Sequence, residues 1–555
     1  MWGCVDAWGV DLSYGFGPAL LGFAVQTLTN VIAAFSIAEM ISAFPSAGGL
    51  VGFARISLGH WGSFLCGTTE CLYLGLSATF GTLLWGNYMF DAYQLSDPKY
   101  LVLFSALMYV MSFSVISIGG RFMWNFFVVT AVMSAAVILL YFISAIKHGD
   151  FLHNAFNTNG LPTDDFNTGP VISEGRRLLS TFTPTGMPTS SPTAFPARRW
   201  FTGGWMGIFS ALPTVYWTIA GNEVSCVAGE EIHDPTVNVP KGLIAGALYA
   251  YFVTICMFFA GVSLPAGTAG LPLSLHPIVD GVQLLFPRTS PVTITGICSI
   301  GALATVTTWF YAFSRQLFSL SRKGFLPGIL AYIANGSPFA SLLFGLLIGF
   351  AIVVIINISG NYEFTTIVLV LLQISAMFTD VCLFAAYVGM KVHHPKMERP
   401  FKSPFGLIGG IYGLILASFC VACSIITQLN KIVYIGSLLG SCIILWSGYY
   451  FFVSRHNLEF DEDEKKAVIE SITIDSLLKT EYGLDYLELY MKKEMNSEAL
   501  ICLLVLFLTL LLHWIKSYDR KHGSIWKRRL CRWTHSESIV KHMYAYYSLN
   551  SSYDF

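Results

Sequence analysis

The segment YWTIAGNE, residues 216–223, combines residue types that can bind a small charged solute inside an apolar environment. Gly221 permits a break in a helix, and a broken helix frees backbone N–H and C=O groups that a ligand can satisfy. Freed carbonyls suit an ammonium group, and freed N–H groups suit an anion. We therefore predict that this segment forms a substrate site, with Trp217, Thr218, Ile219, Ala220, Gly221, Asn222 and Glu223 as its binding residues.

Three acidic residues, Glu70, Glu223 and Asp380, stand inside apolar stretches, where a charge is costly to bury. Glu223 fits a proton acceptor or a counter-charge for an ammonium, and the alternative is a structural hydrogen-bond acceptor. Glu70 is expected to face the site, and Asp380 to line a cytoplasmic cavity. Thr305 and Thr308 could offer hydroxyls to Na⁺. Coupling to protons or to Na⁺ is therefore left open, and no cofactor is expected.

The composition places these residues in a membrane. Hydrophobic residues make up 54% of the 555 residues and charged residues only 12%, about half the share in soluble proteins. Eleven apolar segments are long enough to cross a bilayer as helices, and an incomplete one opens the chain at 1–17. The sequence predicts a multi-pass integral membrane protein, at the plasma membrane. The full segments run over 18–43, 61–89, 100–118, 122–146, 203–228, 242–263, 292–314, 338–358, 364–390, 405–428 and 432–453.

Other functional classes find little support. Most of the twelve cysteines lie inside apolar runs, and the pair Cys420 and Cys423 has no second pair nearby to complete a zinc site. No nucleophile, metal or phosphate-loop motif is present, so we expect no enzyme and no metal site. A net charge of -1 argues against a nucleic-acid partner.

Basic residues in the short loops predict the orientation. One alternating set of loops carries ten Lys and Arg residues and the other carries three, which places the first set in the cytoplasm. The long loop at 147–202 then falls outside the cell. Its stretch 180–197 is rich in Ser, Thr and Pro and is predicted to be disordered.

This loop divides the chain into comparable blocks. Five segments precede it and five follow, and the first segment of each block is interrupted by Gly, Pro or charged residues. Matched interrupted helices indicate a transporter binding site, although Gly and Pro are also common in membrane helices. We predict a first repeat (1–146, first helix incomplete), the loop (147–202), a second repeat (203–391), two further helices (392–455) and a C-terminal extension (456–555). The extension contains a short apolar run at 499–512, which we expect to lie at the membrane interface rather than to cross.

Four motifs connect the chain to a known family. They read SIAEMISAFPSAGGLVGFAR (36–55), ALPTVYWTIAGNEVSCVAGEEIHDPTVNVPKG (211–242), FSRQLFSLSRKGFLP (313–327) and ERPFKSPFG (398–406). In this order they resemble the amino acid–polyamine–organocation permease superfamily over residues 1–453. The pieces ALP-x-x-x-W, AGEE-x-x-DP and SRQLFSLSR, with Glu70 after GTT, are most similar to its ethanolamine permease branch.

The resemblance implies an all-α membrane protein with the 12-helix, LeuT-like 5+5 inverted-repeat transporter fold. It also implies that Trp217 acts as a gate and that Trp309 lines the pocket, where tryptophan faces suit an ammonium. The alternative for both is packing against lipid. The family's first helix carries an unwound glycine motif that meets the substrate carboxylate, but this chain starts at MWGCVDAWG. We expect that the sequence is truncated, and the alternative is that half of the substrate site was lost.

The charged residues of the motifs lie where helices meet the cytoplasm. Glu39, Arg55, Glu230, Arg315 and Arg322 are predicted to hold an inner gate by ion pairs. Arg315 and Arg322 are seven residues apart and share one helix face. The alternative is that these charges only anchor loops and set the topology.

The leading interpretation is a secondary transporter that imports a small amine or an amino acid by alternating access. The alternative is a non-transporting membrane receptor or subunit derived from a permease. The partners are then a small solute and the lipid bilayer, and the oligomeric state is unknown.

The charge count can be tested by labelling single cysteines with a membrane-impermeant thiol reagent. A cysteine in the loop 147–202 should be labelled on intact cells, whereas Arg322→Cys should be labelled only after permeabilisation. Labelling of the parent chain, which has twelve cysteines of its own, is the background to subtract. Labelling at position 322 from outside would reverse the predicted orientation.

Overall fold

The computed structural model describes residues 12, 15–44, 48–156, 204–232, 234–271, 274, 276–334, 336–359, 362–395, 397–427 and 432–454. All of them belong to one compact unit, residues 1–496, and the second unit is 497–555. Most of the predicted incomplete helix at 1–17, most of the loop 147–202 and the extension 456–555 lie outside the described residues. The predictions made for those segments stay predictions.

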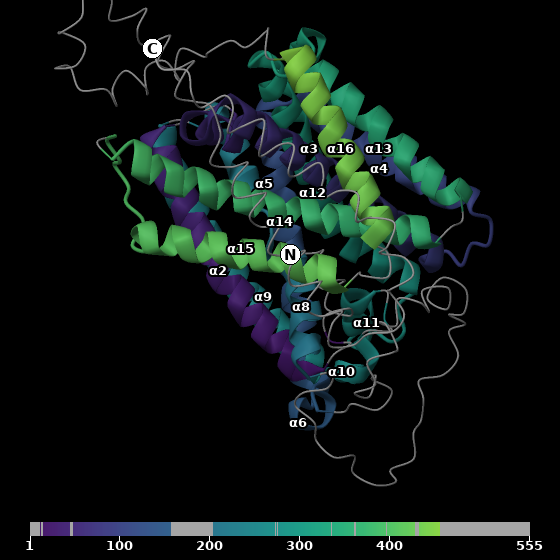
Figure 1. The fold of residues 1–555 in the computed structure, drawn as a ribbon. Helices are drawn as coiled ribbons and strands as arrows, with labels where there is room; N and C mark the ends of the chain where they lie inside the picture. Colours follow the sequence, from purple (N-terminus) through teal and green to yellow (C-terminus); the bar gives the residue numbers. More distant parts are fainter. Residues whose placement is uncertain are drawn as a thin grey trace, which may run out of the picture. The chain divides into compact units, whose positions relative to one another are not determined.

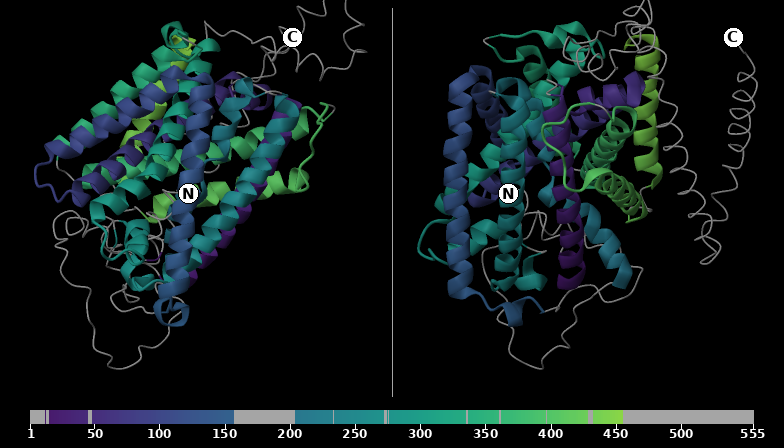
Figure 2. Two further views of the ribbon diagram at one scale, coloured as in Figure 1. Left: turned by 180° about the vertical axis from the view of Figure 1, so that it is seen from behind. Right: turned by 90° about the vertical axis from the view of Figure 1, so that its left-hand side faces the viewer.

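In its described residues each full apolar segment of the sequence is helical, apart from an interruption at Ala220 and Gly221 (Figures 1 and 2). The described residues contain no strand, apart from an isolated bridge between Ala334 and Ser337. Within the described part of the chain, eight helices are long and apolar enough to cross a membrane, so the predicted class of all-α membrane protein is confirmed. The long helices are α2 (Phe16–Ala43), α3 (Leu50–Ala92), α4 (Lys99–Ile118), α5 (Gly120–His148), α8 (Gly204–Ile219), α9 (Pro235–Ser263), α12 (Pro291–Arg322), α13 (Phe339–Ser359), α14 (Tyr362–His393), α15 (Gly406–Thr427) and α16 (Ile432–Phe452).

Short helical pieces connect them. They are α6 (Phe151–Asn154), the 3₁₀ helix η2 (Asn222–Glu231), α10 (Gly267–Gly270), α11 (Pro277–Gln283) and the 3₁₀ helix η4 (Gly328–Ala331).

Helix α3 lies at the centre of the packing, between α12 and α14. Three glycines of α3 let α12 approach closely. Gly67 faces Leu320, Gly75 faces the ring of Phe313, and Gly81 faces Val306. Because a larger side chain would have no room at these positions, the two helices are held at short range along several turns.

The outer helices have the opposite character. Only 17% of the most apolar window of α5 is buried, against 72% for the window Ile367–His393 of α14. Most exposed side chains of α5 are apolar, for example Val128, Val132 and Ile146, and the exposed charged ones, Arg121 and Lys147, lie at its two ends. A helix whose exposed side is apolar is suited to contact with lipid.

The helix contacts are duplicated within the chain. In the two predicted repeats α2 corresponds to α9, α3 to α12, α4 to α13 and α5 to α14. When each helix is replaced by its counterpart, the contact of α3 with α14 becomes the contact of α12 with α5. In the same way α2–α14 becomes α9–α5, and α3–α13 becomes α12–α4, and all of these pairs are in contact. Two repeats would make such matching contacts, and the repeats, their bounds and their inverted relation stay predictions.

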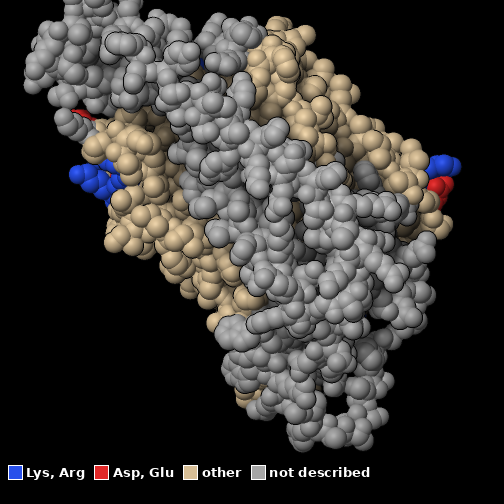
Figure 3. All heavy atoms as spheres, viewed as in Figure 1, with Lys and Arg blue, Asp and Glu red and all other residues tan. Residues whose placement is uncertain are grey.

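The described surface in Figure 3 is mostly uncharged. The charged side chains that are visible on this face lie at its left and right edges.

Candidate functional site

The interruption predicted at Gly221 is present. Helix α8 ends at Ile219, and the chain continues after Ala220 and Gly221 as the 3₁₀ helix η2. Gly221 has φ 126° and ψ 4°, a backbone conformation that residues with a side chain rarely adopt. The sequence therefore needs glycine here, and the break is built into the chain.

The side chain of Asn222 ties the break to two neighbouring helices. Its amide nitrogen donates to the backbone oxygen of Asn30 on α2 at 3.1 Å and to the hydroxyl of Tyr251 on α9 at 2.6 Å. These contacts fix the direction in which η2 leaves the break.

An aromatic side chain covers the break from α12. The ring of Trp309 lies against Gly221 and makes an edge contact with Tyr73 of α3, with ring centroids 5.3 Å apart. Trp309 thus contacts the predicted binding segment. Trp217 and Thr218 lie on the last turns of α8, and their side chains are outside the described part of the structure.

A cavity of about 580 Å³ opens beside the break. Ile219, Ala220, Gly221 and Asn222 line it, together with residues of η2, α5, α9 and α12. Thr308, considered above for Na⁺, lies on its wall, but its hydroxyl donates to the backbone oxygen of Ala304 in its own helix. Polar side chains on the wall of this cavity are Trp124, Asn222, Ser225, Asn238, Tyr251, Thr308 and Tyr311.

Three buried carboxyl groups lie around η2 and α3. Glu223 comes directly after the break, and both Glu70 on α3 and Asp380 on α14 lie within electrostatic range of it. Each side chain is at most 4% exposed. Gln316 of α12 donates to Glu70 at 2.5 Å, and the groups that interact with the three carboxyls in the described chain are acidic or neutral. The structure therefore gathers acidic side chains at the break without a basic partner among those groups.

Glu39 has the opposite surroundings. Its carboxylate pairs with Lys391 at 2.5 Å and with Arg399 at 3.5 Å, and it accepts from the hydroxyl of Tyr387 at 2.7 Å and the backbone N–H of Ser403 at 3.0 Å. These partners join the end of α2 to the end of α14 and to the loop that follows. Lys391 and Arg399 were not marked as partners of Glu39 by the sequence.

The predicted gate arginines lie against aromatic rings. The guanidinium of Arg55 is 5.5 Å from the ring centre of Phe325, that of Arg315 is 5.6 Å from Tyr311, and that of Arg322 is 5.6 Å from Phe318. The side chain of Glu230 is outside the described part. Pairing among Arg55, Glu230 and Arg315 thus stays a prediction.

Comparison with known proteins decides the family. The chain matches the amino acid permease family over residues 13–451. The chain belongs to this family.

Its relatives are transport proteins. The permease is 24% identical to the methylthioribose transporter of Bacillus subtilis (strain 168) over 486 residues, which are 82% of this chain and 92% of the relative. It is also 24% identical to the branched-chain amino acid permease BcaP of the same organism, over 70% of this chain and 77% of the relative. The protein is therefore an integral, multi-pass membrane transporter and not an enzyme.

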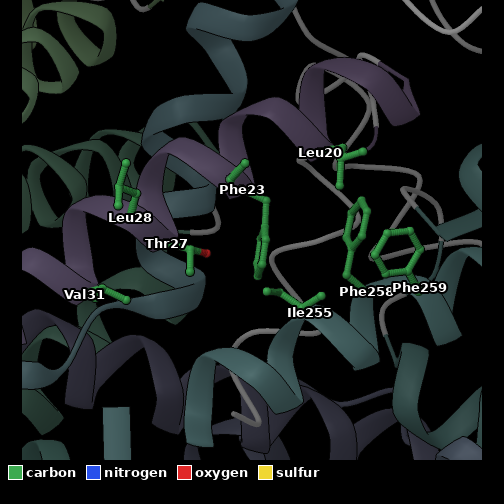
Figure 4. A pocket seen from close by; sticks show the side chains of 9 residues that line it. Leu20, Phe23, Thr27, Leu28, Val31, Ile255, Phe258 and Phe259 are labelled. Atoms are coloured by element: carbon green, nitrogen blue, oxygen red, sulfur yellow. The ribbon is translucent and has the colours of Figure 1, made fainter. Parts of the chain in front are cut away.

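A second hollow in the permease has a different character (Figure 4). It measures about 350 Å³ and lies between α2 and α9, and Figure 4 shows Phe23, Ile255 and Phe258 among its lining side chains. Thr27 is the one lining residue with a polar side chain. An apolar hollow of this kind cannot replace the hydration of a charged solute, so it is a poor substrate site.

Several contacts of the site could not be read from the sequence. Tyr73, Asn30 and Tyr251 were missed because a Tyr or Asn in an apolar run gives no signal of its partner. Gln316 lies inside the motif SRQLF, which could have drawn attention to it. In the described residues no group of three or more His, Cys, Asp or Glu side chains is arranged to hold a metal ion.

The break in the permease predicts a strong effect of Gly221→Ala. A side chain at φ 126° strains the backbone by about 1–3 kcal/mol, so uptake should fall severalfold in protein that still reaches the membrane. The matched control is Gly246→Ala, since Gly246 also lines the cavity but lies in α9 with nothing within 4 Å of an added Cβ. Equal uptake by the two variants would show that the conformation at Gly221 is unimportant.

The surroundings of Glu39 predict that the protein loses more stability when Glu39 is replaced than when Lys391 is replaced. Glu39→Gln leaves both Lys391 and Arg399 without their carboxylate, so it should cost about 3 kcal/mol or more of stability. Lys391→Met should cost less, because Glu39 keeps Arg399. Thermal unfolding of the detergent-purified protein measures both, with exposed Lys402→Met as the control. If Glu39→Gln matches that control, the pairs contribute nothing to stability.

Proposed function

We propose that this permease imports a small amine or an amino acid across the plasma membrane by alternating access, and that its site favours a cationic solute. Ethanolamine and cationic amino acids are the substrates that this site would suit. The observation that carries the proposal is the position of Glu223, which is buried directly after the break and within electrostatic range of Glu70 and Asp380.

The charge around the break supports this choice. An amino acid presents an ammonium and a carboxylate, whereas ethanolamine presents an ammonium and a neutral hydroxyl. The three carboxyls offer a counter-charge for an ammonium, and Trp309 offers an aromatic face beside Gly221. No Lys or Arg lies inside the apolar segments between 18 and 228 to meet a carboxylate.

Family membership alone does not choose among substrates. One relative is named for methylthioribose and the other for branched-chain amino acids, which are chemically different solutes. Charge at the site is therefore the better guide to the substrate of this chain.

Buried carboxyls also favour protons over Na⁺ as the coupling ion. A buried carboxyl group without a cationic partner tends to take up a proton. Binding of a cation would then release that proton, and uptake would rise with external pH as the carboxyl ionises. Coupling to Na⁺ is the alternative, since Thr305 and Thr308 donate to backbone oxygens of their own helix and keep the lone pairs of their hydroxyl oxygens.

Uptake into proteoliposomes tests the proposal. Glu70→Gln should weaken uptake of labelled ethanolamine about tenfold or more, because a charge-assisted contact is lost, and should affect leucine uptake less. Glu398→Gln, which removes an exposed carboxylate from a loop, is the matched control.

Two results would contradict the proposal. Strong alanine or leucine uptake, with ethanolamine neither carried nor competing, would exclude a preference for cations. Saturable binding of a solute without any uptake would instead favour the alternative of a permease-derived receptor.

A further inference from the structure

The contact between Glu70 and Gln316 is unusual because both side chains are completely buried. Gln316 Nε2 on α12 lies 2.5 Å from Glu70 Oε2 on α3, and the two residues are 246 positions apart in the chain. Both side chains are 0% exposed. Within the described chain the second oxygen of each, Oε1 of Glu70 and Oε1 of Gln316, has no further hydrogen-bond partner.

An amide can satisfy a carboxyl group in both of its protonation states. Its NH₂ group donates to an ionised carboxylate, as in the arrangement described here. If the amide turns over, its carbonyl oxygen can accept from the O–H of the protonated acid. Glu70 can therefore keep its hydrogen bond to Gln316 whether it is ionised or protonated, which an apolar partner or a protonated lysine would not allow.

The titratable groups around this pair come from two elements packed against it and from α3 itself. They are Glu223 and Cys226 on η2 and Cys66, Cys71 and Tyr73 on α3, with Asp380 of α14 next to Tyr73 and Glu223. None of these groups is basic. A proton or a bound cation is thus the species that can balance the charge of Glu70.

The position of the pair also matters. Gly67, one helical turn before Glu70, contacts Leu320, one turn after Gln316. Beyond this contact, Gly48 of the FPSAGG turn lies against Ser319 and Lys323. The pair therefore stands between the break and the end of α12 that carries the charged motif.

We propose that Glu70 and Gln316 form the proton-exchange pair of this permease, with Gln316 as the residue that positions Glu70 in both protonation states. The proposal rests on the proposed transport of a cationic solute. When the ammonium binds, the Glu70 O–H bond breaks and its proton passes to water. The Gln316 amide then donates to the carboxylate, so one positive charge replaces another and no redox step is involved.

Three variants test the pair in proteoliposomes by the pH dependence of ethanolamine uptake. Gln316→Met keeps the length of the side chain but removes the donor. Because the ionised form of Glu70 loses most, the midpoint of uptake should move to higher pH by about one unit, a tenfold change in proton concentration. Gln316→Glu can share a proton with Glu70, so it should retain more uptake at neutral pH than Gln316→Met. Ser314→Ala is the control, since Ser314 is buried on α12 and donates only to the backbone oxygen of Tyr311.

A second measurement needs no variant at Gln316. Addition of ethanolamine to the purified protein in weak buffer should release a proton, which an indicator dye reports, and Glu70→Gln should abolish the release. An unchanged midpoint in Gln316→Met, or no proton release from the parent protein that carries ethanolamine, would overturn the pair while leaving the proposed function intact.

The failure of the proposed function would look different. If the parent protein carries neither ethanolamine nor leucine, transport of these solutes is excluded. The proton exchange of Glu70 with Gln316 beside it is then tested by the pH dependence of thermal unfolding. There Glu70→Gln should remove a transition that Gln316→Met moves to higher pH. Identical profiles for the parent protein and Gln316→Met would then refute the pair.

Discussion

Backbone N–H and C=O groups cannot stay unsatisfied in hydrocarbon, and this constraint governs the centre of the molecule. The break at Ala220 and Gly221 frees such groups in the middle of a membrane helix. The surrounding structure covers the break with Trp309 and ties it to α2 and α9 through Asn222. A cavity lies beside the break, and Glu223, the second residue of η2, lies within electrostatic range of Glu70 and Asp380.

Buried charge is treated in two different ways in this protein. Glu39 is surrounded by two cations and two further hydrogen-bond donors, so its charge is matched where the ends of α2 and α14 meet. Glu70, Glu223 and Asp380 interact only with neutral and acidic groups among the described residues. The first arrangement suits a fixed joint between helices. The second leaves acidic side chains whose charge a proton or a cation could balance, which the proposed transport of a cationic solute would use.

The helices and the break could be predicted from the sequence because both depend on local features. Long apolar runs form membrane helices whatever their neighbours are, and Gly221 gives the backbone access to positive φ, which can end a helix. The partners could not be predicted in the same way. The charge count places Glu39 near several basic residues but does not say that Lys391 and Arg399 are the ones it meets. Likewise, Glu70 and Gln316 are brought together by the packing of α3 on α12, over 246 positions.

The glycines along the contact of α3 with α12 limit how this protein can move. Gly67, Gly75 and Gly81 each pack against a side chain of α12. A shift of one helical turn, about 5.4 Å, would bring Phe313 against a side chain where it now meets Gly75. Sliding of α3 along α12 is therefore costly, and the proposed alternating access would have to keep the register of these two helices, and with it the contact of Glu70 with Gln316.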